Sequence, residues 1–132
     1  IKGSALLRQQ SGGVVTCAGN EVFLNPVTAY ATERVAVLYG SPSGGYRPAN
    51  APPVKFEPDN EALYGSLLRR TRCDAQGFFK FENIAQGDYF VSTSITWSVP
   101  TGGGLTSTQG GAINQRTPVL DGETKEVVLT AR

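Results

Sequence analysis

The sequence predicts an all-β fold: an antiparallel β-sandwich of roughly seven strands with one short helix inserted. The 16 glycines and 8 prolines among 132 residues indicate many short strands joined by turns. Apolar and polar side chains also alternate along several segments. Only 17% of the residues are charged and the net charge is +1, which argues against a disordered chain and against nucleic acid as a partner. The length suits a single domain, residues 1–132.

The first half of the chain is expected to contain several strands, one helix and a long loop. Strands are predicted over Ile1–Arg8, Val14–Cys17, Glu21–Pro26 and Ser66–Cys73. Thr28–Tyr39 favours a short helix capped by Thr28 and ended by Gly40, although its VAVLY run also fits a strand. Residues 41–58 hold five prolines and are predicted to form a long exposed loop. A single helical turn, with Asp59 as its cap, is expected over Asp59–Tyr64.

The second half has the clearest strand pattern. After a turn over Asp74–Gly77, Phe79 and Phe81 are predicted to share one face, and Ile84 ends the strand. A longer strand follows, with one face predicted to lie in the core: Tyr89, Val91, Thr93, Ile95 and Trp97. The glycine-rich segment 100–111 is predicted to be a flexible loop. The last two strands, 112–120 and 124–130, are expected to form a hairpin through the turn DGET.

The segment from Asp74 to Val91 follows the pattern D-x-x-G-x-F-x-F-x-x-I-x-x-G-x-Y-x-V. Its members are Asp74, Gly77, Phe79, Phe81, Ile84, Gly87, Tyr89 and Val91. This pattern resembles the carboxypeptidase regulatory-like domain, a prealbumin-like (transthyretin-like) β-sandwich. The segments GSA at 3–5, VFLNP at 22–26 and GETKEVVL at 122–129 also fit that family, whereas 28–64 departs from it. The resemblance implies core and turn roles for these residues, in an accessory, stalk, binding or envelope-surface module that generally lacks catalysis.

The chain contains two cysteines, Cys17 and Cys73, each beside a predicted strand. We predict that they form one disulfide, worth roughly 4 kcal/mol by the loop that it closes, with two separate buried thiols as the alternative. A disulfide implies an oxidising compartment, so the protein is expected to be secreted or exposed in the cell envelope, in the periplasm or on the outer surface. The start at Ile1 rather than Met fits a processed chain.

Catalysis, a cofactor and a metal site are not expected. The sequence contains no His, the commonest general base, and no G-x-S-x-G elbow. The acidic group Glu57, Asp59 and Glu61 is interpreted as solvated charge around a helix start rather than a calcium site. An isopeptide crosslink from Lys2 is not favoured, because the last strand offers no Asn.

We therefore expect a non-enzymatic structural or adhesive module that contacts other proteins, most of all copies of itself, in a filament or surface layer. The expected contacts lie in segments 41–53 and 100–111, with Tyr46, Arg47 and Leu105 as the contact residues. The alternative is a carbohydrate- or ligand-binding accessory module of the cell envelope. In that case aromatic rings would supply stacking faces, and the available rings are Trp97, Tyr46, Tyr39 and Tyr64.

Overall fold

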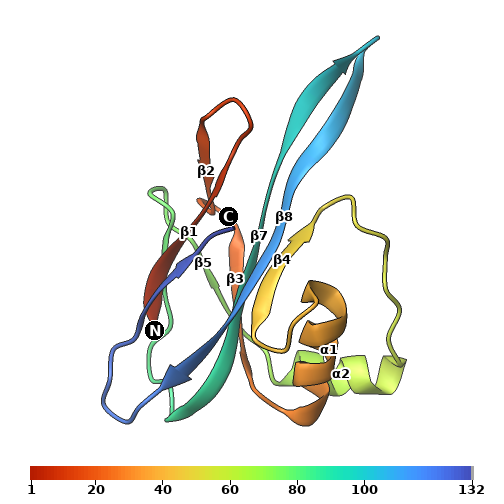
Figure 1. Ribbon diagram of the computed structural model, residues 1–132. Helices are drawn as coiled ribbons and strands as arrows, with labels where there is room; N and C mark the ends of the chain where they lie inside the picture. Colours follow the sequence, from red (N-terminus) through yellow and green to blue (C-terminus); the bar gives the residue numbers. More distant parts are fainter. Residues whose placement is uncertain (132) are drawn as a thin grey trace.

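The computed structural model describes residues 1–131, which form two β-sheets and two helices (Figure 1). The strands are β1 (Lys2–Arg8), β2 (Val14–Thr16), β3 (Glu21–Pro26), β4 (Gly44–Pro48), β5 (Arg69–Arg72), β6 (Phe78–Lys80), β7 (Gly87–Gly102), β8 (Leu105–Val119) and β9 (Glu126–Leu129). The smaller sheet contains β1, β2, β6 and β9, and the larger sheet has the order β4-β8-β7-β3-β5. All strand pairs are antiparallel except the parallel pair of β1 and β9.

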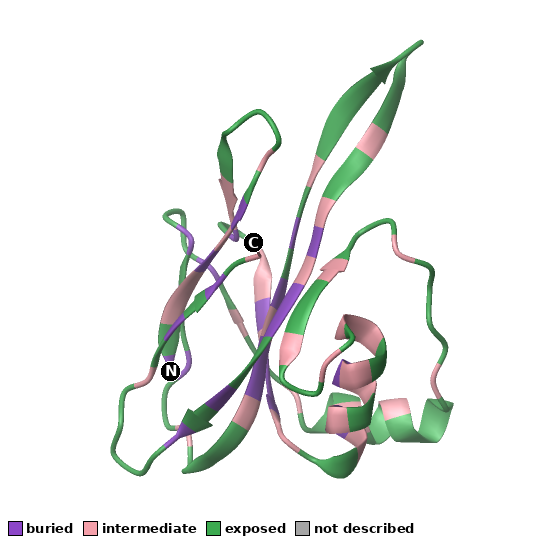
Figure 2. Cartoon of the chain, viewed as in Figure 1, coloured by how far each residue is buried: buried purple, intermediate pink, exposed green. Residues whose placement is uncertain are grey.

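The core lies between the inner faces of the two sheets, which confirms the predicted all-β architecture. Strands β1, β3, β7 and β9 contribute side chains from one face to it, including Ala5 and Leu7, Val22 and Leu24, Val91 and Ile95, and Val127 and Leu129. Figure 2 shows the buried positions gathered along the middle of the strands, whereas the outer part of the β7–β8 ribbon is exposed. The predicted alternation in the first and the longest strands is therefore correct.

Two helices cover the outer face of the larger sheet. Helix α1 (Ala29–Tyr39) begins as predicted, because the Thr28 hydroxyl accepts a hydrogen bond from the Ala31 amide at 3.1 Å, and it ends at Gly40 in the left-handed region. It packs against Phe90, a buried residue on the face of β7 opposite to the one that was predicted to lie in the core. Helix α2 (Pro58–Ser66) is longer than the single helical turn that was expected over Asp59–Tyr64. Its cap position is Glu57 rather than Asp59, because Pro58 has the fixed φ that suits the first helical residue.

Two segments that were predicted to be long loops contain strands, although residues 49–57 of the first form neither strand nor helix and agree with the prediction. Residues 44–48 of the 41–58 segment are β4, which pairs with β8. Within 100–111, β7 and β8 continue to a tight turn between Gly102 and Leu105. Gly111, one of the glycines that suggested a loop, is needed for the pairing, because a Cβ there would lie 2.1 Å from the Arg47 carbonyl oxygen.

The expected hairpin between the last two strands is also wrong. After β8 the chain leaves the larger sheet. Strand β9 then pairs with β1, with Gly3 opposite Val127 and Ala5 opposite Leu129. The turn over 121–124 therefore belongs to a connection between the sheets. This pairing is non-local, so no pattern near the turn could indicate it.

The two cysteines form a disulfide, as predicted, with an S–S distance of 2.05 Å. Both are buried, and they join the turn after β2 in the smaller sheet to the end of β5 in the larger one. The alternative of separate thiols is therefore wrong.

The residues of the quoted motif lie at packing and turn positions. Phe79 and Phe81 are buried with their ring centroids 6.2 Å apart, although β6 ends at Lys80. Val91 is fully buried, and the Tyr89 hydroxyl donates to the Ala85 carbonyl at 2.7 Å. The other members are Asp74 and Gly77, which are joined by a backbone hydrogen bond in the turn before β6, Ile84 packed against the core, and Gly87 at the start of β7.

Candidate functional site

A cleft of about 520 Å³ opens between the two sheets at one side of the molecule. We call it the open-edge cleft, because its walls include β4, at the edge of the larger sheet, and β9, which pairs only with β1. It is lined by Leu6, Leu7, Arg8, Tyr46, Trp97, Val128, Thr130 and Ala131.

The two aromatic residues of the cleft come from strands that are not neighbours. Tyr46 on β4 lies opposite Ile113 of β8, which in turn lies opposite Thr93 of β7. Trp97 is four residues beyond Thr93 and therefore shares the inner face of the sheet. The register of β4, β8 and β7 thus places both rings on one side, facing the end of the smaller sheet.

Trp97 is held by its contacts before any ligand arrives. It packs against the core cluster, as its place on the predicted core face suggested, but it stays partly exposed, so part of its ring also faces the cleft. Its ring lies over the backbone of Gly110, where an added Cβ would be 2.8 Å from Trp97 Cζ3. Tyr46 is 37% exposed. The cleft therefore presents two ordered aromatic side chains that a ligand can reach.

Arg8 is the charged residue of this cleft. It is exposed at the end of β1, and in the part of the chain that the structure describes its guanidinium makes no hydrogen bond or ion pair. No carboxylate lines the cleft among residues 1–131. The polar groups available to a ligand are the Arg8 guanidinium, the Tyr46 and Thr130 hydroxyls and the Trp97 indole N–H.

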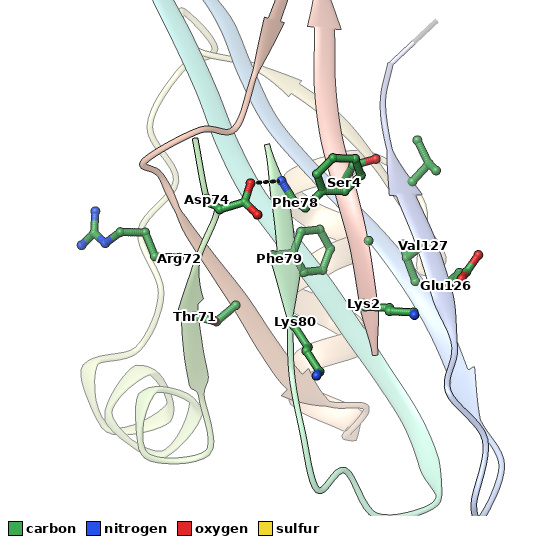
Figure 3. A pocket seen from close by; sticks show the side chains of 12 residues that line it. Lys2, Ser4, Thr71, Arg72, Asp74, Phe78, Phe79, Lys80, Glu126 and Val127 are labelled. Atoms are coloured by element: carbon green, nitrogen blue, oxygen red, sulfur yellow. Dashed lines mark hydrogen bonds between the residues drawn. The ribbon is translucent and has the colours of Figure 1, made fainter. Parts of the chain in front are cut away.

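A second hollow, of about 650 Å³, lies beside β1, β6 and β9 (Figure 3). We call it the lysine hollow, because Lys2 and Lys80 lie directly opposite each other on β1 and β6. Phe78 is 57% exposed here and Val128 is 58% exposed. The carboxylate of Asp74 accepts hydrogen bonds from the turn amides of Gln76 and Phe78, so it serves the turn. Val128 also lines the open-edge cleft, which makes the two hollows adjacent.

A smaller cleft of about 240 Å³ lies between the helices and the larger sheet. Its wall includes Arg34, whose Nε donates to Glu61 at 2.8 Å and whose guanidinium stacks 4.3 Å from the Tyr64 ring centroid. The Tyr30 hydroxyl also donates to Glu61, at 2.6 Å. The hydrogen bond from Arg34 lowers the pKa of Glu61, and burial together with the bond to Glu61 raises the pKa of Tyr30 to about 12. These groups satisfy one another and fasten α2 to α1.

The predicted contact residues do not form one surface. Tyr46 faces the open-edge cleft, whereas the Arg47 guanidinium donates to the carbonyl oxygens of Leu38 and Pro52 and so fastens the chain around β4. Leu105 is 69% exposed at the tip of the β7–β8 ribbon. It is eight residues along β8 from the partner of Tyr46, or roughly 27 Å.

Sequence reasoning missed Arg8, Thr130 and the other non-aromatic residues of the cleft. These residues meet because β1 and β9 pair in parallel, which brings the ends of the two strands together. A sequence-based prediction would have needed this pairing to identify them. Among the described residues, no group of three His, Cys, Asp or Glu is placed to hold a metal, and Glu57, Asp59 and Glu61 are no exception. Within the same residues, neither helix is long and apolar enough to cross a membrane.

The fold is similar to that of a solved protein. A crystal structure from Pseudomonas aeruginosa, of a protein described as a "putative carbohydrate binding protein", superposes with a TM-score of 0.77 at 25% sequence identity. The match covers 98% of this chain and 85% of that chain. No family model matches the sequence, and no curated protein matches it. The likeness to the Pseudomonas protein therefore extends over nearly the whole of this chain.

Proposed function

We propose that this protein is a non-enzymatic carbohydrate-binding module and that it binds sugar in the open-edge cleft. The observation on which this depends is the meeting of Trp97 and Tyr46, from non-adjacent strands, beside Arg8, which makes no ion pair within the described part of the chain. We also propose that the sandwich is prealbumin-like and related to the carboxypeptidase regulatory-like domain, on the basis of the motif from Asp74 to Val91.

The chemistry of the cleft suits a sugar. A pyranose ring has a C–H-rich face that packs on an aromatic ring and hydroxyls that need hydrogen-bond partners. Trp97 and Tyr46 offer the aromatic surface together with an N–H and an O–H, and Thr130 and Arg8 add further partners. The volume of about 520 Å³ lies within the usual range for small-molecule sites. Because Trp97 is already packed in place, ordering it on binding costs little.

Two further observations support carbohydrate binding over self-assembly. The Pseudomonas protein with the similar structure is described as a carbohydrate binding protein, although only as a "putative" one. Segment 100–111 is largely paired strand, residues 44–48 of segment 41–53 pair with β8, and Arg47 is engaged within the chain. Assembly into a filament or surface layer stays a prediction. The buried disulfide supports a secreted or envelope-exposed location.

A glycan array followed by calorimetry on the best ligand tests the proposal. Tyr46→Ala should weaken binding by up to about tenfold, as expected for the loss of one stacking ring. Tyr64→Ala removes the same side chain from the cleft between helices and sheet, and it should leave the affinity unchanged. Trp97→Phe keeps the packing against the core and tests the larger ring, whereas Trp97→Ala would also destabilise the fold.

Three results would contradict the proposal in different ways. If the array retained no glycan, carbohydrate binding itself would be refuted. Loss of binding in Tyr64→Ala but not in Tyr46→Ala would move the site to the helical side. Release of a shortened sugar from a bound oligosaccharide, seen by chromatography, would refute the non-enzymatic reading.

A further inference from the structure

We infer that the carbohydrate is acidic: a chain of carboxylate-bearing sugars, an oligouronate, that runs from the open-edge cleft along the outer face of β1 into the lysine hollow. This inference rests on the proposed function and names its ligand class. Three features support it: Arg8 has no ion pair among residues 1–131, Lys2 on the same face of β1 has none there either, and the exposed Val128 lines both hollows.

Arg8 differs from every other arginine that the structure describes. Each of the others donates to a carbonyl oxygen or lies within 4.0 Å of a carboxylate: Arg34, Arg47, Arg69, Arg70, Arg72 and Arg116. Arg8 has no such partner among residues 1–131 and lines a cleft without a carboxylate. A guanidinium presents a planar fork of N–H donors that matches a carboxylate in a two-bond arrangement. Arg8 is therefore suited to bind a carboxylate of a ligand in the cleft.

Lys2 supplies a second cation on the same face. Side chains alternate along β1, so Lys2, Ser4, Leu6 and Arg8 point to one side. Lys2 lies directly opposite Lys80, an arrangement of like charges that costs stability. Lys80 is compensated by Glu82 at 2.7 Å, whereas the Lys2 ammonium has no ion pair in the described chain, even though Glu126 is its cross-strand neighbour on β9. A carboxylate bound between the two lysines would relieve their repulsion.

The path between the two cations suits a polymer. Six residue steps separate Lys2 from Arg8, or about 20 Å along an extended strand. Along this path Phe78 of β6 and Val128 of β9 flank Ser4 from its two sides and are 57% and 58% exposed. An apolar contact surface thus lies between the two cations, where the sugar rings of a chain with a carboxylate at each end of this stretch would pack. A neutral sugar chain can accept hydrogen bonds from Arg8 and Lys2, but it would leave both without a charged partner among the described residues.

The test compares matched acidic and neutral ligands. The probes are hexamers of galacturonate, mannuronate and glucuronate, each with its carboxyl-reduced counterpart, measured by calorimetry. We expect at least one acidic hexamer to bind, carboxyl reduction to weaken it at least tenfold, and added salt to weaken it further. Arg8→Gln should weaken binding roughly tenfold. Arg70→Gln makes the same charge change on β5 and should have no effect, because Arg70 lines neither hollow.

Ligand length tests the path along β1. Lys2→Gln should weaken the acidic hexamer and leave the dimer of the same sugar unaffected, because only the longer chain reaches the lysine hollow. Equal effects of Lys2→Gln on dimer and hexamer would overturn the path.

The remaining outcomes separate this inference from the proposed function. Equal binding of acidic and reduced hexamers, still lost in Tyr46→Ala, would overturn the acidic class and leave carbohydrate binding intact. Acidic binding that is indifferent to Tyr46→Ala, or equally weakened by Arg70→Gln, would be general ion exchange and would overturn the inference. Binding of no hexamer, together with no glycan retained on the array, would overturn both.

Discussion

Removal of the disulfide should cost this protein a large share of its stability. The bond closes a loop of 56 positions between Cys17 and Cys73. In the chain-entropy treatment, a loop of this length confines the unfolded chain enough to contribute about 4 kcal/mol at 25 °C. For 132 residues the entropy of unfolding converts this loss into a Tm that is lower by about 14 °C. The double variant Cys17→Ala/Cys73→Ala is the appropriate perturbation, because both positions are buried and a serine hydroxyl there would need a partner.

Urea unfolding and calorimetry of the wild type and the double variant measure this loss. The oxidised wild type should show no free thiol in a native-state titration, since both sulfurs are buried and bonded. The reasoning would be refuted by a loss of less than about 1 kcal/mol, which would place the loop-closure contribution far below its usual range. Two titratable thiols in freshly purified native protein would refute it as well.

Three further predictions concern the sheet, the helices and the ribbon. Gly110→Ala should cost about 1–3 kcal/mol in urea unfolding, because Gly110 has φ +87° and the new Cβ would lie 2.1 Å from the Ile95 carbonyl oxygen; a cost near zero would contradict this. Glu61→Gln should be destabilising at neutral pH. Because Arg34 holds the pKa of Glu61 below its ordinary 4.5, this contribution is present above that pH and disappears as the pH falls through the lowered pKa. A difference between wild type and Glu61→Gln that stays constant into strong acid would refute the linkage. Leu105→Ser should change the free energy of unfolding by less than about 0.5 kcal/mol and leave glycan affinity unchanged, since Leu105 lies at the exposed ribbon tip; weakened binding in calorimetry would show that the ligand reaches the ribbon.

Much of the fold was predictable because local patterns set it. Alternation specified the core face from Tyr89 to Trp97, and Thr28 and Gly40 marked the two ends of α1. The prediction failed where composition and pairing conflict. Glycine is typical of loops, yet Gly111 lies within β8. A glycine is needed at this position, because a neighbouring backbone approaches too closely for any side chain.

The site was predictable only in part. The sequence indicated Trp97 and Tyr46 as separate possible stacking faces, since exposed aromatic residues favour ligand contact. Their meeting depends on the register of three strands, which a single sequence specifies weakly. Arg8 and Thr130 carry no local signal, because they reach the cleft through a pairing between residues more than a hundred positions apart.

That same pairing governs the order in which the molecule can fold. The β7–β8 hairpin joins adjacent strands and can form early, but the smaller sheet is complete only after β9 has found β1 across almost the whole chain. Contacts of such high sequence separation raise the contact order and slow folding toward the millisecond-to-second range typical of all-β domains. Residues of both β1 and β9, the two strands that pair last, line the open-edge cleft. Binding competence should therefore appear with the last step of folding rather than with the collapse of the larger sheet.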